Sequence, residues 1–514
     1  MPSATTLIAL ATFGLALVVY RATMLPGVGA WDTAENQTVP ALLGTMHPTG
    51  FPAYVLLGWA ANQVLAPFGD TALRMNLLSG ILAAGAGGLS VVVFRRLGAP
   101  ALVAGAISVA FALAPITWHI GVSADVHSLH LLLVVLLTLL LLRWDAAVRD
   151  ARDSPGDPAV GRRADRWIVA TAAVFGVAVA NHALTLLLVP GVAAFVLATQ
   201  PGLLRRPRLV LAAIGVALGV AALLYLELPL RAGPFRAALV YGHPETPSGL
   251  LEILVARQFQ GDIVGGSAAS QFAALVDLAR AQLGPLLYLV PVAFVVTAIR
   301  RPRYALYSGL AVLITCVFAA TYSNARIDRY YLGPLFFAWS WVAVTVGEIV
   351  ARVPGTAPDD ADGSVAGPDV SRIAVSAVLG LALLVPTAIG IRDRWSEQDL
   401  STSTALAEWL DSAFDAMEPD ALVISWWSYS TPMWYGQLVE GRRPDIRIVD
   451  DRTRLDEHLG EVADVIEANI DARPVYVIRL QASEVQALEA RFTIESVGRP
   501  GNLYHVTGRT ESTP

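Results

Sequence analysis

The chain is poor in charge and almost without cysteine. Only 15% of its 514 residues are charged, whereas 55% are hydrophobic. A soluble domain of this size carries more charge and less apolar surface. The single cysteine, Cys316, excludes an intramolecular disulfide framework and a metal site built from several cysteines. Because Cys316 lies in an apolar run, we interpret it as a small core residue.

Lysine is absent, so all 36 basic residues are arginine. We interpret this as compositional bias and infer no function from it. The formal net charge of −6 excludes a strongly basic nucleic-acid-binding protein, and we expect no nucleic acid as a partner. The sequence also contains no phosphate-binding loop, no dinucleotide-binding fingerprint and no internal repeat.

Long apolar runs dominate the sequence instead. Runs of about 20 apolar residues are typical of transmembrane helices, so we expect a polytopic α-helical protein in the lipid bilayer. The first run has no basic region before it and no small-residue cleavage site before Trp31, which favours a span over a signal peptide. The expected spans, about eleven, are 7–25, 72–94, 101–117, 127–143, 167–180, 183–199, 209–228, 281–299, 304–321, 331–350 and 372–391.

Arginine placement orients these spans. The arginine clusters at 95–96, 143–166, 205–208, 300–303 and 352–372 all fall in loops on one side, which the positive-inside rule assigns to the cytoplasm. We therefore expect an integral protein of the bacterial cytoplasmic membrane with its N-terminus inside and its C-terminal part outside. Asn181 and His182 must separate two short spans, since one continuous span would break the arginine pattern.

The composition changes after Ile391. We expect a transmembrane domain over 1–391 and a small extracytoplasmic α/β domain over 392–514. Its expected strands are near 421–427, 445–450, 474–480 and 504–508, and its expected helices are within 428–441, 454–470 and 482–490. The stretch from Gly355 to Asp369 is interpreted as a flexible acidic linker on the inner side.

The first external loop contains the stretch WDTAENQTVPALLGTMHPTGFPAY, Trp31 to Tyr54. Asp32 and Glu35 are three residues apart and would share one face of a helical turn. A partly desolvated carboxylate can have a raised pKa and act as a general base. The alternative is a solvated loop acid or a helix N-cap. His47 lies in a proline-rich turn, where a histidine alone is more often structural than functional.

Further polar groups lie at the same face. Asp125 can cap the next helix, whereas His127 and His130 share a helix face and could form part of a metal site that lacks defined further ligands. Ionisable groups at membrane depth are costly, so Asn181 and His182 are expected to face the protein interior or a cavity.

Arginines at the outer headgroup level suit a phosphate, which a guanidinium can bind bidentately. The candidates are Arg231 and Arg329, the latter flanked by Asp328 and Tyr330. The alternative for each arginine is snorkelling to ordinary lipid headgroups. An acid beside arginines above apolar spans suits a lipid that carries a phosphate-linked group.

Several motifs carry a family resemblance. An acid-x-x-Glu after the first span, followed by His-Pro-x-Gly-Phe-Pro, resembles the transmembrane protein 260 family of O-mannosyltransferases and its bacterial relatives, within the GT-C superfamily. The segments that continue the resemblance are SADVHSLH, NHALTLLLVPG, LPLRAG, ALVYGHPETPSGLLEILVARQF, DRYYLGP and WWSYSTPMWYGQLVEGRRPDIRIVD. The chain departs from the family pattern at Asp125, His127 and His130, where glutamate, tyrosine and asparagine are expected.

The resemblance implies a GT-C fold and transfer of a sugar, expected to be mannose, from a polyprenyl phosphate to an acceptor hydroxyl on a protein or glycan. The transfer would occur outside, with inversion. Asp32 would be the general base, with Glu35 orienting the acceptor or tuning the pKa of Asp32. His47 and His182 would line the site, and Arg231 and Arg329 would hold the phosphate.

No metal and no other cofactor is expected for such an enzyme, besides the lipid-linked sugar itself. Two other classes of function remain open. One is a multi-pass transporter or lipid flippase, since buried polar groups in broken helices also mark transport sites. The other is a structural or sensory membrane protein whose C-terminal domain binds a ligand.

Overall fold

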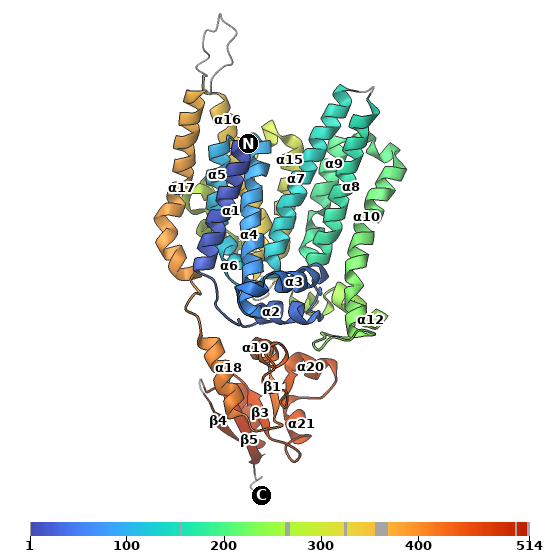
Figure 1. Cartoon of the computed structure of the whole chain (residues 1–514), viewed down its shortest axis with the longest axis vertical. Helices are drawn as coiled ribbons and strands as arrows, with labels where there is room; N and C mark the ends of the chain where they lie inside the picture. The colour runs from blue at the N-terminus through green and yellow to red at the C-terminus, as the bar shows by residue number, and fades with distance from the viewer. Residues whose placement is uncertain are drawn as a thin grey trace, which may run out of the picture.

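The computed structural model describes residues 2–154, 157–262, 268–322, 326–354, 369–498 and 501–510. A bundle of helices forms the larger part, and a small domain with a sheet lies beyond one end of it (Figure 1). The bundle helices are α1 (Ala4–Ala22), α4 (Thr71–Arg96), α5 (Ala101–Ala112), α6 (Pro115–Val122), α7 (Val126–Asp153), α8 (Pro158–Asn181), α9 (Val189–Thr199), α10 (Pro207–Tyr225), α13 (Ala268–Leu283), α14 (Val290–Arg300), α15 (Pro302–Ala320), α16 (Leu332–Ala351) and α17 (Val370–Gln398).

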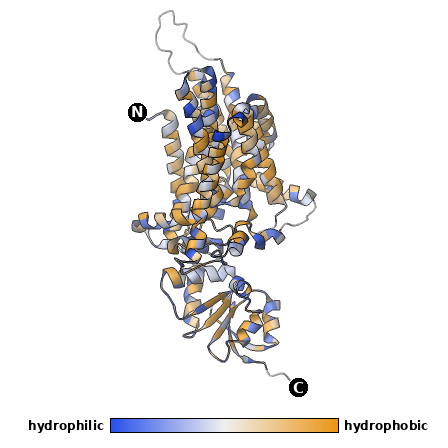
Figure 2. Cartoon of the chain, turned by 90° about the vertical axis from the view of Figure 1, so that its right-hand side faces the viewer, coloured by the Kyte–Doolittle hydropathy of each residue, from blue (hydrophilic) through white to orange (hydrophobic). Residues whose placement is uncertain are grey.

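The bundle has the lengths and hydropathy of an integral membrane protein. Within the described residues, eight helical segments are long and apolar enough to cross a bilayer. The pair α5 and α6, bent by 65°, forms a ninth. The two remaining expected spans correspond to α8, whose first turns carry arginines, and to the short α9. Hydrophobic residues cover the bundle, whereas hydrophilic ones gather at its ends and on the sheet domain (Figure 2).

Inner and outer helices differ in burial. In the most apolar windows of α4 and α16, 72% of the residues are buried inside the protein, whereas none is buried in that of α10. Small residues bring α1 and α4 together, since a Cβ on Gly88 would lie 2.9 Å from the Ala9 carbonyl oxygen. The buried helices therefore form the core, and α10 presents its side chains to lipid.

The expected break at Asn181 and His182 is confirmed. Helix α8 ends at Asn181, and the 3₁₀ helix η2 (Ala183–Leu188) begins directly after His182. His182 has an extended backbone, and its Nδ1 accepts a hydrogen bond from the Leu184 N–H at 3.2 Å. The imidazole thus caps η2. The break at this point divides one apolar run of the sequence into two spans.

Short elements cover the end of the bundle that faces the sheet domain. They are α2 (Asp32–Leu42), α3 (Pro52–Val64), η1 (Ala66–Phe68), α11 (Glu227–Ala232), α12 (Pro247–Leu254), η4 (Arg257–Asp262) and η6 (Ile327–Tyr331). At the opposite end or within the bundle lie η3 (Pro201–Arg205) and η5 (Gly284–Leu289). Figure 1 shows α2 and α3 lying across the bundle axis between the spans and the sheet domain.

The C-terminal domain is built on a five-stranded sheet in the order β2-β1-β3-β5-β4. Strands β1 (Leu422–Ser425), β2 (Arg447–Asp450) and β3 (Val475–Ile478) are parallel, whereas β4 (Phe492–Val497) and β5 (Leu503–Arg509) pair antiparallel. Its helical elements are α18 (Ala405–Ala416), α19 (Trp427–Trp434), the π-helix η7 (Tyr435–Val439), α20 (Asp451–Asp456), α21 (Val462–Glu467) and α22 (Ala482–Glu489).

Sequence patterns located four of the five strands and missed β4. Of the residues of that strand only Phe492 is buried, and its apolar residues are not contiguous, so its hydrophobic signal is weak. Helix α17 continues past Ile391 to Gln398, so the expected domain boundary lies inside this helix and α18 begins at Ala405. The expected linker after Gly355 lies outside the described residues except for Asp369.

The sheet domain contacts the segment between α1 and α4 and the first turn of α4. The Tyr435 hydroxyl accepts the Ala72 N–H at 3.0 Å, and the Thr431 hydroxyl donates to the Trp31 carbonyl at 3.0 Å. Helix α19 packs on α2. These contacts join the domain to the loop that carries the acidic motif.

Candidate functional site

Asp32 lies where three distant segments of the chain meet. It is the first residue of α2, and Trp31 before it reverses the chain with a φ of 55°. Asp32 Oδ1 accepts a hydrogen bond from Trp427 Nε1 at 3.1 Å, and Oδ2 accepts one from Arg329 Nη2 at 3.3 Å. Trp427 comes from the sheet domain and Arg329 from η6. The side chain does not cap α2, so its contacts are with other parts of the protein.

Arg329 links Asp32 to a second carboxylate. Its Nη1 donates to Asp125 Oδ2 at 2.9 Å. Asp125 Oδ1 accepts both the backbone N–H and Nδ1 of His127, each at 2.8 Å. Asp125 is therefore the N-cap of α7, as one interpretation of the sequence predicted, and it also belongs to the cluster around Asp32. One guanidinium group thus bridges two carboxylates, with one hydrogen bond from a different nitrogen to each.

Glu35 binds His47 with both carboxylate oxygens. Oε1 accepts the His47 backbone N–H at 2.8 Å, and Oε2 accepts the His47 Nδ1–H. Glu35 is buried, and aromatic rings of Phe51, Phe259 and Trp427 surround the imidazole with centroids 5.1 to 6.3 Å away. Glu35 thus holds His47 in place with both of its carboxylate oxygens.

The charges of this cluster change the proton affinities. Burial raises the pKa of Asp32, but the positive charges of His47 and Arg329 and the Trp427 hydrogen bond outweigh it, so this pKa lies below its ordinary value. This corrects the expectation of a raised pKa, because burial was only one of the effects. Burial lowers the pKa of His47, but the adjacent Glu35 carboxylate outweighs it and raises the pKa to about 9.

Imidazole and phenol rings form the wall beside this cluster. The rings of His127 and His182 are 4.7 Å apart, and Tyr330 lies 5.8 Å from each. Among the residues that the structure describes, His127 Nε2 and Asn181 Oδ1 are buried polar atoms that find no hydrogen-bond partner. Such atoms carry a cost unless a ligand or water satisfies them. Asn181 Nδ2 donates to the Val126 carbonyl at 3.3 Å.

Two cavities meet at Asp32. The first, of about 490 Å³, lies toward the spans and is called here the membrane-side cavity; besides Asp32, His47 and Arg329 it is lined by Asn36, Thr49, Phe51, His127, His182, Leu184, Leu186, Leu187, Leu254, Phe259, Arg326 and Tyr330, among others. The second, of about 690 Å³, is called the interdomain cavity; it is lined by Trp31, Asp32, Thr33, His47, Tyr241, Phe259, Arg326, Arg329, Trp426, Trp427, Asp450, Asp451 and Arg452, among others.

The two cavities share Asp32, His47, Phe259, Arg326 and Arg329. A molecule in either cavity can therefore contact the same acid and the same two arginines. Pockets with few convergent polar groups in an apolar lining are typical of substrate sites.

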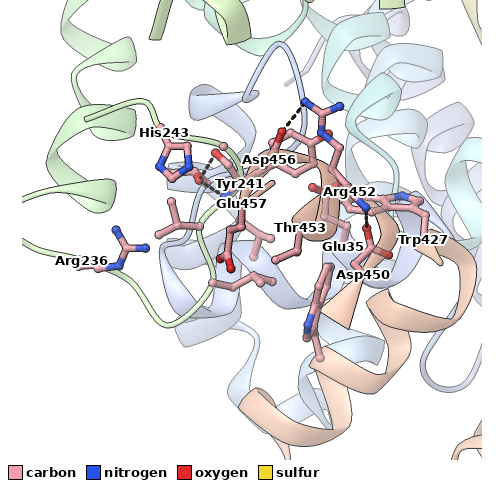
Figure 3. Close-up of a pocket in the computed structure, with 16 residues that line it drawn as sticks. Glu35, Arg236, Tyr241, His243, Trp427, Asp450, Arg452, Thr453, Asp456 and Glu457 are labelled. Atoms are coloured by element: carbon pink, nitrogen blue, oxygen red, sulfur yellow. Dashed lines mark hydrogen bonds and ion pairs between the residues drawn. The ribbon is translucent and has the colours of Figure 1, made fainter. Parts of the chain in front are cut away.

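Trp427 also lines a smaller cleft of about 90 Å³ (Figure 3). Glu35, Tyr241 and Asp450 line it, and the Arg452 guanidinium lies 5.7 Å from the centre of the Tyr241 ring. Burial raises the pKa of Asp450 to about 6, even though its carboxylate accepts a hydrogen bond from Ser430 at 2.6 Å. Through Asp450 and Arg452, the sheet domain therefore contributes polar groups to this cleft.

Not every expected residue reaches the cluster. Arg231 in α11 donates to the carbonyl oxygens of Leu43 at 2.6 Å and Leu42 at 3.3 Å, where it satisfies the C-terminal end of α2. It lines neither cavity. Asp328 pairs with Arg326 at 3.6 Å and does not line the cavities either.

Asp32, Glu35 and His47 could also supply ligands to a metal ion, because their ligand atoms lie within 4.8 Å of one another. However, both Glu35 oxygens are occupied by His47, and the Arg329 guanidinium at 3.3 Å from Asp32 opposes a cation. The residues present do not favour a metal here, and the expectation of a metal-free enzyme stays a prediction.

Sequence patterns did not single out Trp427, Tyr241 or Arg452. Trp427 was within a motif that carried the family resemblance, but the pattern there indicated only a strand followed by a helix. Its role depends on a contact across 395 residues of chain, which no local pattern reveals.

Comparisons with known proteins agree with this architecture. Residues 32–203 match the model of the family described as the N-terminal domain of protein O-mannosyl-transferase TMEM260. Mouse protein O-mannosyl-transferase TMEM260 is 36% identical over 141 residues, which are 27% of this chain and 19% of the mouse protein. The match therefore spans about a fifth of the length of that relative.

Among solved structures, ArnT from Cupriavidus metallidurans bound to undecaprenyl phosphate has a TM-score of 0.58 at 17% identity, with 97% of each chain covered. The oligosaccharyltransferase AglB from Archaeoglobus fulgidus, in complex with an inhibitory peptide and a dolichol-phosphate, has a TM-score of 0.52 at 14% identity, over 98% of this chain and 74% of AglB. The chain has the GT-C fold that these membrane enzymes share.

Proposed function

We propose that this chain is a membrane glycosyltransferase that moves mannose from a polyprenyl phosphate to an acceptor hydroxyl, on the membrane face that carries the sheet domain. The observation that carries the proposal is the position of Asp32 at the junction of the two cavities. A group-transfer enzyme needs a place for the donor and a place for the acceptor, with a proton acceptor between them.

The donor occupies the membrane-side cavity. Leucines from η2 form its apolar wall, and Arg326 and Arg329 lie at its polar end. The lipid chain remains against the spans while the arginines bind the phosphate. The undecaprenyl phosphate and dolichol-phosphate in the two related folds support this placement, and the match to the O-mannosyl-transferase family supports mannose as the sugar.

The acceptor occupies the interdomain cavity. Its hydroxyl oxygen attacks the sugar carbon that is bonded to the phosphate, from the face opposite to the leaving group. The new glycosidic bond forms as the carbon–phosphate-oxygen bond breaks, the proton passes to Asp32, and polyprenyl phosphate leaves. This displacement inverts the anomeric centre. Arg329 and Arg326 stabilise the negative charge on the leaving phosphate, so the step needs no metal.

The low pKa of Asp32 has a role in this scheme. Asp32 is ionised throughout the neutral range, because Arg329 and His47 stabilise its charge. A phosphate that binds Arg329 competes with Asp32 for the same guanidinium group. Donor binding therefore weakens the Asp32–Arg329 pair and raises the proton affinity of Asp32 when the acceptor must lose its proton.

The sheet domain completes the acceptor side. Trp426, Trp427 and Arg452 line the interdomain cavity, where Trp426 packs against Trp31 and both Trp427 and Arg452 pack against Tyr241. Aromatic faces with a few charged groups suit either a sugar ring or a peptide segment. The acceptor is accordingly a glycan or a protein that reaches the enzyme from the extracytoplasmic side.

A direct test is incubation of the purified full-length chain with polyprenyl-phosphate mannose, with and without candidate glycans and peptides. We expect free polyprenyl phosphate and a mannosylated acceptor, measured by mass spectrometry. Movement of intact donor across proteoliposomes without release of polyprenyl phosphate would establish the transporter alternative. That alternative is disfavoured because transport sites lie near the membrane midplane, whereas this cluster lies at one end of the bundle.

The orientation can be tested separately. In a Cys316→Ser background, a cysteine at Ser401 in the sheet-domain connection should react with an impermeant thiol reagent in intact cells. A cysteine at Ala159, near the arginines that begin α8, should react only after permeabilisation. Reaction of both from the same side would contradict the proposed topology.

A further inference from the structure

Another pocket lies at the opposite end of the bundle from the sheet domain. Its volume is about 400 Å³, and α4, α7, α9 and the junction of α14 with α15 contribute its walls. We call it the arginine pocket; it is lined by Arg96, Leu97, Leu142, Asp145, Ala146, Arg149, Phe195, Arg300, Arg301, Pro302, Arg303 and Tyr304. The proposed glycosyl transfer makes no use of it.

The arginine pocket contains more positive charge than its acids neutralise. Asp145 pairs with Arg149 at 3.0 Å and with Arg303 at 3.2 Å, and Glu348 pairs with Arg300. Five guanidinium groups thus face two carboxylates, a difference of three positive charges. Within the part of the chain that the structure describes, Arg96 and Arg301 have no carboxylate within ion-pair distance.

Helix ends do not remove this excess. Arg96 is the last residue of α4 and Arg300 the last of α14, and each helix C-terminus contributes roughly half a negative charge. The N-terminus of α15, which begins at Pro302, contributes roughly half a positive charge. An excess of about two to three positive charges therefore remains, and a pocket of this size can accept an anion that balances it.

The floor of the pocket is apolar. Leu97, Phe195 and Tyr304 are buried beneath the arginines, and Leu142 lies beside them. In the chain, the arginines at 300–303 are flanked by Ile299, which is 72% exposed, and by Leu306, which is 43% exposed. A ligand that fits has a negative headgroup for the arginines and hydrocarbon for these neighbouring side chains, which is the chemistry of a phospholipid.

We propose that the arginine pocket binds an anionic phospholipid of the leaflet on this face, with its phosphate between Arg96 and Arg301. The two side chains come from different parts of the bundle, and Arg301 reaches the turn after α4, where its Nη2 lies 3.4 Å from a Cβ placed on Gly98. A bound phosphate joins α4 to the α14–α15 junction. Basic pockets between membrane helices commonly hold such headgroups.

Native mass spectrometry of the purified full-length protein tests the proposal, with phosphatidylglycerol and phosphatidylcholine added in equal amounts. Wild-type protein should retain phosphatidylglycerol in preference. Because each arginine near a membrane surface contributes about 1 kcal/mol toward an anionic lipid, the Arg96→Gln/Arg301→Gln variant should lose on the order of 30-fold of that preference.

The matched control is Arg162→Gln/Arg163→Gln, which removes two exposed arginines from the start of α8, on the same side but outside the pocket. This control should keep the preference. Equal loss in both variants, or equal binding of the two lipids to wild type, would overturn the proposal. Displacement of the lipid by low-millimolar inorganic phosphate would show that the pocket binds a free anion and would equally overturn it.

The helical content of each variant, measured by circular dichroism, must match wild type for the comparison. If the double variant does not fold, the single Arg96→Gln variant replaces it, with Arg162→Gln as its control. We expect an intermediate loss of preference, about fivefold, from one arginine. An unchanged preference in that variant would also contradict the proposal. None of these readouts depends on glycosyl transfer.

Discussion

Replacement of Asp32 by asparagine separates its chemical role from its structural one. Asparagine keeps the shape of the side chain and an oxygen that accepts the Trp427 Nε1–H, which is 3.1 Å from Asp32 Oδ1. It removes the charge that faces Arg329 and the ability to take a proton. Arg329 keeps its hydrogen bond to Asp125 at 2.9 Å, so the guanidinium is not left unpaired.

The structural loss should be small. Asp32 is about one-third exposed, and an ion pair at such a site contributes about 0.2 to 1 kcal/mol. A negative charge in the first turn of α2 adds about 0.3 to 1 kcal/mol. The variant should therefore lose about 0.5 to 2 kcal/mol of stability, a shift of at most a few degrees in Tm.

The catalytic loss should be larger. General base catalysis contributes about 10²- to 10⁴-fold, which corresponds to about 3 to 5 kcal/mol of activation free energy. We expect the rate of polyprenyl phosphate release in single turnover to fall by that factor, while donor binding persists. The matched control is Asp70→Asn, the same change at the aspartate that caps α4, where asparagine caps equally well.

Near-normal turnover of the Asp32→Asn variant would refute the assignment of Asp32 as the base. A fall in turnover that accompanies loss of donor binding or a large drop in Tm would show that Asp32 acts through the fold instead. Glu35 would not be an equivalent replacement, because both of its oxygens hold His47.

Further substitutions test the neighbours of Asp32. Arg329→Ala should weaken binding of polyprenyl phosphate by at least tenfold in a direct assay, with partial recovery in Arg329→Lys, which lacks the bidentate fork. Arg231→Ala should leave that affinity unchanged, because Arg231 binds the end of α2. Equal effects of the two alanine substitutions would contradict the assignment of Arg329 to the phosphate. Trp427→Phe removes one hydrogen-bond donor to Asp32 but keeps an aromatic ring, so kcat should fall roughly tenfold while KM for the lipid-linked sugar stays the same. A change confined to KM would exclude a role of Trp427 in positioning Asp32. The pKa of His47 is raised to about 9 from about 6.5 in the unfolded chain, so its stabilising effect is complete below pH 6.5 and is lost as pH rises through 9. Between pH 7 and 10, Tm should fall more steeply in wild type than in His47→Gln, and parallel curves would exclude this pair as the cause.

Local features of the sequence determined the membrane architecture. The length of an apolar run is set by the bilayer, so the spans can be read without knowledge of contacts. The orientation inferred from arginine placement stays a prediction. The same reasoning found the break between α8 and η2, where Asn181 and His182 interrupt a run. The parallel strands of the sheet domain were also found, because buried strands form short apolar runs.

The contacts around Asp32 could not be found in this way. Arg329 is 297 residues away and Trp427 is 395 residues away in the chain. The acidic motif indicated a partly buried base with a raised pKa, whereas the surrounding charges lower it. Arg231 and Arg329 had the same sequence signal, an arginine next to the end of an apolar run, but one binds backbone carbonyls and the other binds two carboxylates.

The sequence by itself therefore determined that the chain is a bundle of membrane spans with an acidic segment after the first span and a separate α/β domain. Only the tertiary structure decided which arginine faces Asp32, the direction of the Asp32 pKa shift and the contribution of the sheet domain to the site. The physical reason is range: spans and strands depend on the hydrophobicity of neighbouring residues, whereas charge pairing and proton affinity depend on distances of a few ångströms between groups that the fold brings together.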